Sequence, residues 1–201
     1  MTTFRKCKLC KKKIIKEHAT YFHLRAFCCY EHLRKYIRSE EGKTYIHRQI
    51  AVSEKQEKQK LKTKKDYIKE AQAAVNKYVR MRDIYKGYGC ISCKKDYDGN
   101  KYNWDAGHLI SRKNPKTRFN LWNINLQCVK CNRYGYGELL EYRSNLIARI
   151  GREKVNWIQD HFRDEHRFNI EYLVRMKKIF NKKARRLEKK IQDLSVLERA
   201  K

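Results

Sequence analysis

The chain has 201 residues, which is enough for one or two small domains. Its 50 lysine and arginine residues against 22 acidic residues give a formal net charge of +28, an excess too large to be incidental. No apolar run approaches the roughly 18–20 residues of a membrane span, and no apolar stretch follows the basic N-terminus, so we expect no membrane partner. The charge predicts a polyanionic partner, most simply a phosphate backbone; a basic surface without a specific partner is the alternative.

A cluster of cysteines opens the chain, where Cys7-Lys-Leu-Cys10 is followed by Cys28-Cys29-Tyr-Glu-His32. Two thiolates, a spacer of hairpin length and a Cys-x₃-His element predict a small zinc module over residues 1–35. The expected ligands are three thiolates and one imidazole: Cys7, Cys10, Cys28 and His32. Cys29 is the alternative to Cys28, and His18 and His23 are further candidates. The module would contact DNA or protein; a hydrophobic hairpin with spare thiols is the alternative.

The next stretch, residues 36–65, is polar and rich in lysine, which predicts either a solvated helix or a flexible basic linker. Asp66 is a candidate cap for the helix that follows. The apolar stripe of that helix, with Ile68, Val75 and Val79, predicts packing against the central part of the chain. Basic side chains on its other faces could meet DNA: Lys77, Arg80 and Arg82.

Two further cysteine pairs, Cys90-Ile-Ser-Cys93 and Cys128-Val-Lys-Cys131, stand in the middle of the chain. Each pair makes a short turn that aims two thiolates at one ion, and four thiolates suit a tetrahedral zinc site. Such a site has no open coordination position, so we expect the zinc to be structural. Two disulfides or buried free thiols are the alternative, which the lysine-rich chain without a secretory signal makes less attractive.

The residues between these pairs carry the candidate chemistry. Residues 102–110 alternate as a strand does, with His108 near its end, and a polar loop over 111–117 follows. Asn123 precedes the second cysteine pair, and a short helix is expected from Cys128 onward. A neutral imidazole can take a proton from water, and carboxylate and amide oxygens are the ligands that Mg²⁺ prefers.

This pattern resembles the HNH, or ββα-metal, nuclease motif in its zinc-stapled form. The resemblance implies a hairpin and a helix around one catalytic Mg²⁺ or Mn²⁺. It makes His108 the general base and Asn123 the residue that fixes the loop orienting His108. It makes Asp105 and Asn132 ligands of the catalytic metal. The expected products carry 5′-phosphate and 3′-hydroxyl ends.

The sequence departs from the motif at two positions. Gly107 stands directly before His108, where many such sites have the acidic ligand, so the assignment of Asp105 needs a shift along the strand. Gly135 stands where many such helices have a lysine, and Arg133 is the candidate for that phosphate contact.

The C-terminal third is expected to be helical. Residues 134–137 predict a turn, 138–150 a helix that Gly151 ends, and Asn169 the start of a last long helix with a basic tail. A short helix around Val155 and Ile158 lies between them. Dimerisation through the apolar stripe of the last helix is an alternative to simple packing. Side chains expected to contact DNA are all arginines or lysines: Arg112, Lys113, Arg118, Arg133, Arg185 and Arg186.

The order of these parts is similar to that of the phage NinG (Rap) family of recombination nucleases. The shared features are the N-terminal cysteine cluster, the lysine-rich linker, Trp104-Asp-Ala-Gly-His108, Arg118-Phe-Asn120 and Cys128-x-x-Cys131-Asn132. Where that family usually has a fourth N-terminal cysteine, this chain has His32. The resemblance implies a structure-specific endonuclease acting on Holliday junctions, D-loops or other DNA with single-stranded parts. It also implies a homodimer, recombination proteins as partners and the host cytoplasm as location.

Together these features predict a mostly helical α+β protein with a ββα-metal core stapled by zinc. The expected divisions are 1–35 (zinc module), 36–65 (linker), 66–151 (nuclease domain) and 152–201 (helical region). A zinc-containing recombination accessory protein that binds DNA without cutting it is the alternative function. An RNA-directed nuclease is a third possibility, because such a site attacks phosphodiesters without reading the sugar.

Overall fold

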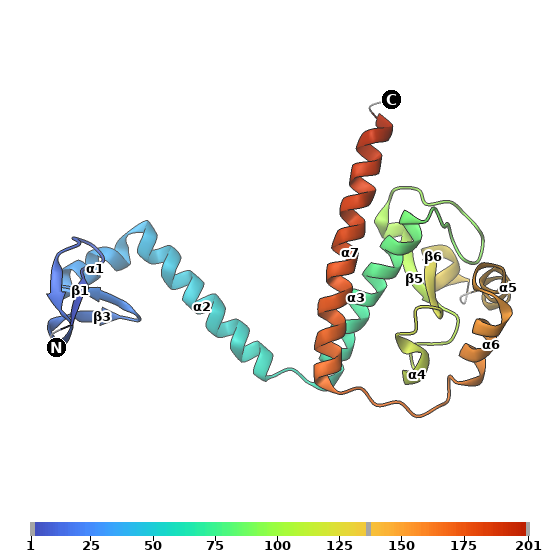
Figure 1. Cartoon of the computed structure of the whole chain (residues 1–201), viewed down its shortest axis with the longest axis horizontal. Coiled ribbons are helices and arrows are strands. Elements are labelled where there is room, and N and C mark those ends of the chain that lie inside the picture. Colours follow the sequence, from blue (N-terminus) through green and yellow to red (C-terminus); the bar gives the residue numbers. More distant parts are fainter. Residues whose placement is uncertain (1–2, 136–137, 200–201) are drawn as a thin grey trace. The chain divides into compact units, whose positions relative to one another are not determined.

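The structure, a computed structural model, describes residues 3–135 and 138–199 (Figure 1). Contacts divide the chain into two compact units, Met1–Lys62 and Thr63–Lys201. The described residues form a mostly helical α+β fold with three two-stranded sheets, which confirms the expected fold class at this level. The four-segment division stays a prediction. Within the described residues, no helix is long and apolar enough to cross a membrane.

The first unit begins with two small antiparallel hairpins. Strands β1 (Phe4–Lys6) and β2 (Lys13–Ile15) form one, and β3 (Thr20–Phe22) and β4 (Arg25–Phe27) form the other. A 3-10 turn, η1 (Lys16–His18), joins them. Their core is the buried set Cys7, Phe27, Leu33 and Tyr36. Such short strands need a further cross-link, and the cysteine cluster lies beside this core.

Two helices complete the first unit, α1 (Tyr30–Arg38) and α2 (Glu40–Lys60). Ser39 separates them, and its hydroxyl accepts a hydrogen bond from the Gly42 backbone N–H at 3.1 Å, which caps α2. The stretch for which the sequence allowed a helix or a flexible linker is therefore mostly helical. Almost all of α2 is exposed, because its sequence has no continuous apolar stripe.

The second unit pairs two long helices, α3 (Lys64–Tyr85) and α7 (Ile170–Arg199), which lie side by side (Figure 1). The predicted apolar stripe of α3 faces α7, and Val75, Leu173 and Phe180 belong to their common core. Two ion pairs add to this contact, Lys177 with Glu70 at 3.0 Å and Lys77 with Glu188 at 2.9 Å. The expected apolar packing is thus found, with α7 as one of the packing partners.

The start of α3 differs from the expectation. Thr63, not Asp66, is the N-cap residue, and its hydroxyl accepts a hydrogen bond from the Asp66 backbone N–H at 3.4 Å. The Asp66 carboxylate accepts one from the Thr63 backbone N–H at 3.0 Å, which completes a capping box. Both residue types cap helices, so the sequence alone left this choice open.

A hairpin of β5 (Trp104–His108) and β6 (Ile124–Cys128) lies beside α3. A short 3-10 turn, η2 (Lys101–Asn103), precedes β5, and α4 (Pro115–Arg118) lies in the connection between the strands. The strand is shorter than the expected 102–110. A π-helical turn, η3 (Lys130–Tyr134), follows β6, where the sequence predicted a short helix. Part of the turn predicted at 134–137 lies outside the described residues.

Two helices cover the other side of the hairpin, α5 (Leu139–Ile150) and α6 (Arg152–Asp160). Gly151 ends α5 with a positive φ of 91°, a conformation that suits glycine, so its expected position is confirmed. Tyr142, Leu146 and Val155 are fully buried and pack with Ile91 from the first cysteine turn. These contacts join α5 to the central cysteine region.

Buried charge joins α3 to β6. The Asp83 carboxylate, almost fully buried, accepts a hydrogen bond from the Leu126 backbone N–H at 2.7 Å and pairs with Arg82. Arg82 also donates to the carbonyl oxygens of Leu121 and Ile124, at 3.1 and 2.9 Å. The expectation that Arg82 could meet DNA is therefore wrong, because its guanidinium is used inside the fold.

Candidate active site and metal-binding clusters

The four central cysteines come together as predicted. Cys90 and Cys93 lie on the turn after α3, Cys128 ends β6 and Cys131 lies in η3, with all four sulfur atoms within 4.8 Å of one another. The Sγ atoms of Cys93 and Cys128 are 3.9 Å apart, and those of Cys128 and Cys131 are 3.4 Å apart. Thiolates about 2.3 Å from one zinc ion lie about 3.8 Å apart in a tetrahedron, so the set can hold zinc.

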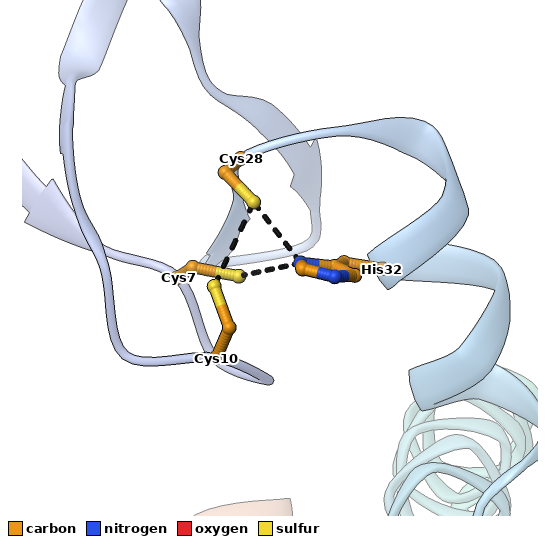
Figure 2. A group of neighbouring side chains, drawn as sticks. All are labelled: Cys7, Cys10, Cys28 and His32. Carbon is orange, nitrogen blue, oxygen red and sulfur yellow. Dashed lines mark hydrogen bonds between the residues drawn. The ribbon is translucent and has the colours of Figure 1, made fainter.

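The second cluster lies in the first unit, where the side chains of Cys7, Cys10, Cys28 and His32 point toward one another (Figure 2). The Cys10 and Cys28 sulfur atoms are 3.7 Å apart, and the Nδ1 atom of His32 lies 3.0 Å from the Cys28 sulfur. Cys29 is exposed and outside the cluster. The choice between Cys28 and Cys29 therefore falls on Cys28, because its side chain faces Cys10 and His32, whereas Cys29 is the exposed N-cap residue of α1.

An open cleft of 640 Å³ brings most of the predicted catalytic residues together. Asp105 and His108 from β5 line it with Asn132 and Arg133 from η3. The sequence assigned Asp105 as a metal ligand although it lies two residues before Gly107, the position that carries the acid in many such sites. The hairpin places Asp105 and His108 on the cleft, and η3 supplies the two side chains from the opposite wall.

His108 is mostly buried at the end of β5, and its Nε2 atom lies 3.3 Å from the carbonyl oxygen of Arg118. A carbonyl can only accept, so the neutral tautomer that satisfies this contact has its proton on Nε2 and its lone pair on Nδ1. Burial, helped by the charges of Arg112 and Arg118, lowers the pKa of His108 from 6.5 to about 4, although the carbonyls of Arg118 and Ala106 act against this. The ring is therefore neutral at pH 7.

Asn123 is fully buried beneath the loop that connects the strands. Its side-chain amide donates to the carbonyl oxygens of Ile110 and Thr117, at 2.9 and 3.1 Å. Its amide oxygen accepts from the Ile110 backbone N–H at 2.8 Å. The loop held in this way leads into Arg118, whose carbonyl binds His108. This is the geometry that a loop-fixing asparagine requires; its part in catalysis stays a prediction.

The Asp105 carboxylate is bound by its neighbours across the cleft. Arg133 pairs with both carboxylate oxygens, at 2.8 and 3.0 Å, and the Asn132 side-chain nitrogen donates to one of them at 2.9 Å. Burial alone would raise the pKa of Asp105, but these hydrogen bonds and the charges of Arg133 and Arg80 lower it overall. Asp105 is therefore ionised at neutral pH, and Asn132 keeps its amide oxygen for another partner.

Three residues around the cleft had not been predicted for it. Arg80 and Asn76 line it from α3, one helical turn apart, although the sequence placed Arg80 only on a general basic face. Tyr142 lies behind the hairpin, and its single hydroxyl proton is shared between the carbonyl oxygens of Gly107 and Asn123, at 2.9 and 3.1 Å. Its place in an apolar helical stripe gave no sign of this polar contact.

The side chains predicted to contact DNA lie in three places. Arg112 and Lys113 are exposed on the loop after β5, and Arg118, partly buried, donates to the Arg112 carbonyl at 2.8 Å. Arg133 lies on the cleft, paired with Asp105. The last two, Arg185 and Arg186, are exposed on α7. Their contacts with DNA stay a prediction.

The fold and clusters define a mostly helical α+β protein with two cysteine-rich groups that can each hold a zinc ion. Residues 2–190 match the family model described as "NinG: Bacteriophage Lambda NinG protein". This match covers most of the chain, so the chain belongs to the NinG family.

Several phage proteins called "Protein ninG" are similar to this chain. The one from Escherichia phage 933W is 34% identical over 181 residues, which are 83% of this chain and 85% of the relative. The one from Escherichia phage lambda is 40% identical over 128 residues, or 63% of this chain and 60% of the relative. The protein from Salmonella phage P22 is also 40% identical, over 129 residues. The chain thus spans about 60% of the lambda relative, and no solved structure matches it.

Proposed function

We propose that the chain is a metal-dependent endonuclease of the HNH type that hydrolyses phosphodiester bonds in branched DNA. The observation that carries this proposal is the convergence of Asp105, His108 and Asn132 on one cleft. A base, a carboxylate and an amide oxygen are the groups that metal-assisted phosphodiester hydrolysis uses. The hairpin β5–β6 followed by η3, with one cysteine pair before β5 and the other at and after the end of β6, agrees with a zinc-stapled ββα-metal core.

His108 is the proposed general base. Its Nδ1 lone pair takes a proton from a water molecule as the water oxygen bonds to phosphorus. The bond between phosphorus and the 3′ oxygen breaks, and that oxygen takes a proton from solvent. The products then carry 5′-phosphate and 3′-hydroxyl ends. The hydrogen bond from Nε2 to the Arg118 carbonyl keeps the ring in the required tautomer and steadies the imidazolium that forms.

Asp105 and Asn132 are the residues that would hold Mg²⁺ or Mn²⁺, and their oxygen atoms fit such a hard cation. Bound there, the cation would stabilise negative charge on the phosphate and on the leaving oxygen. Asp105 is ionised and already faces a positive group, the Arg133 guanidinium, so its position suits a cation. Arg133 would then turn toward a phosphate, since the same carboxylate cannot satisfy both partners fully.

Branched DNA is the proposed substrate on two grounds. The chain carries a net charge of +28, which favours nucleic acids in general. The preference for junctions and D-loops rests on the family resemblance, and resolving a junction needs two cuts, which favours a homodimer. A competition between DNA and RNA substrates separates this proposal from an RNA-directed nuclease.

The test uses a labelled four-way junction and a matched linear duplex, each with Mg²⁺, Mn²⁺ or EDTA. We expect metal-dependent cutting of the junction that His108→Ala abolishes while DNA binding remains. His166→Ala is the control, since His166 is exposed and outside the cleft, and it should cut normally. A His108→Ala variant that cuts at the normal rate would refute the assignment of the base.

A DNA-binding accessory protein without catalysis is the second candidate. The observation in its favour is the pairing of Asp105, whose two oxygens are both bound by Arg133. If that pair is permanent, the carboxylate is closed to a metal and the cleft only binds DNA. Tight binding of the junction without cutting under either metal would support this candidate and overturn the nuclease.

A further inference from the structure

A second cleft, of 600 Å³, lies beside the first. We call it the flanking cleft. It is lined by the N-terminal half of α3 and by the loop after β5, and its basic members are Lys64, Lys65, Lys69, Arg112 and Arg118. Asn76 and Arg112 line both clefts, so the two adjoin. A chain molecule bound in the first cleft could therefore continue into the second.

The flanking cleft has a strongly positive wall. Five cationic side chains line it and, among the residues that the structure describes as lining it, none is acidic. The Arg118 guanidinium lies against the backbone of Arg112, to whose carbonyl oxygen it donates at 2.8 Å. Burial and the neighbouring Arg112 charge both lower the pKa of Arg118. Like charges kept together without a carboxylate call for an external anion.

Two residues that line this cleft each have a buried polar atom without a hydrogen-bond partner. The Nε atom of Arg118 is buried and donates no hydrogen bond. Gln72 is 4% exposed, its side-chain nitrogen donates to Asn76 at 2.8 Å, and its buried amide oxygen has no partner. Leaving such a group unsatisfied costs about 1–3 kcal/mol, so it often marks a place kept for a ligand. An anion beside Arg118 would supply one missing acceptor.

We propose that the flanking cleft binds the phosphodiester backbone of the same strand that is cut in the first cleft, on one side of the scissile phosphate. This rests on the proposed function. Lys65 and Lys69 lie one helical turn apart, about 6 Å along α3, and both are exposed, so they form a row instead of a single anion pocket. A row of cations that continues from the catalytic cleft suits a strand better than a small anion.

The first experiment compares Lys65→Gln/Lys69→Gln with the control Lys101→Gln/Lys154→Gln. The control removes the same charge from exposed lysines outside both clefts. Binding of a labelled junction is followed by fluorescence anisotropy in EDTA over a salt series. The flanking-cleft variant should bind about tenfold more weakly at 0.1 M salt, with the slope of log K against log salt reduced by between one and two. The control should change little, and equal losses in both variants would overturn the proposal.

The second experiment locates the contact on the DNA. Neutral methylphosphonates are placed singly along one junction strand, and binding to each is measured. Substitutions in one short window of the strand should weaken DNA binding by the unaltered protein and have no effect on DNA binding by Lys65→Gln/Lys69→Gln. If the same methylphosphonates weakened DNA binding by this variant as much as by the unaltered protein, the assignment would be refuted. Binding is read without cleavage, so a failed nuclease test and a failed flanking cleft give different results.

Discussion

Replacing Tyr142 with phenylalanine would remove one hydroxyl group from the interior while leaving the ring in place. The side chain is fully buried, and its single hydroxyl proton is shared between the carbonyl oxygens of Gly107 and Asn123, which lie 2.9 and 3.1 Å from the hydroxyl oxygen. It also accepts a hydrogen bond from the Asn125 side chain at 3.2 Å. One oxygen atom thus ties α5 to both strands, directly beside His108.

The expected loss of stability follows from these contacts. A buried hydrogen bond contributes about 1 kcal/mol net, and a buried partner left unsatisfied costs about 1–3 kcal/mol. The ring keeps its volume, so no cavity term is added, and we expect Tyr142→Phe to lower the free energy of unfolding by about 2 kcal/mol. Tyr97→Phe is the matched control. Its hydroxyl donates to the Gly99 carbonyl at 3.2 Å on the surface, and its removal should cost at most about 0.5 kcal/mol.

Urea unfolding followed by tryptophan fluorescence measures the stability of the second unit, which contains Tyr142. All three tryptophans, Trp104, Trp122 and Trp157, lie in the second unit, so the first unit adds no tryptophan signal. Zinc is kept in the buffer for both variants. A Tyr142→Phe loss no larger than that of Tyr97→Phe would refute the argument that this hydroxyl joins the strands to α5.

Three further predictions test other parts of the structure. Cys28→Ser should release one zinc equivalent and Cys29→Ser none, as metal analysis of the purified chains would show; equal release would contradict the cluster in Figure 2. The pKa of His108 falls from 6.5 to about 4 on folding, so between these pH values the unfolded state binds one proton more than the folded state. The free energy of unfolding should therefore fall as the pH drops through this range, by at most about 1.4 kcal/mol per pH unit. In His108→Gln, the free energy of unfolding, measured with urea at several pH values, should depend less steeply on pH. An unchanged slope would refute the assignment of this pH dependence to His108. Asn123→Ala should cost about 3 kcal/mol, since three hydrogen bonds to the loop are lost, while Asn120→Ala, with one half-exposed bond, should cost about 1 kcal/mol or less in the same assay.

Short-range patterns were sufficient for several features. Two cysteines three positions apart already share a turn. The pairs Cys90 with Cys93 and Cys128 with Cys131 therefore predicted a four-cysteine cluster that can hold a metal, which the structure contains. The helical spacing of apolar residues predicted α3 because one face of that sequence must be buried. The cap of α3 was misplaced, since Thr63 and Asp66 are both residue types that cap helices, and in the structure each side chain accepts a hydrogen bond from the other's backbone N–H.

Several contacts between distant residues could not be predicted from the sequence, because only tertiary packing brings these residues together. Arg82 reaches β6 from α3, and nothing in the helical pattern separated it from the exposed arginines. The same packing turned Arg80 toward the cleft and joined Asp105 to Arg133, 28 residues further along.

The amino-acid sequence alone therefore determined the residues of the two metal-binding groups, the mostly helical class and the charge, while His108 as general base stays a prediction. These depend on residue type and on local spacing, and the cysteine pairs, although distant in the chain, could be joined because a zinc ion takes four such ligands. The tertiary structure decided which side chains share a cleft, which arginines are used internally, and that Tyr142 supports the strand that carries His108. These depend on how β5 and β6 pack between α3 and α5, a geometry set by the whole core.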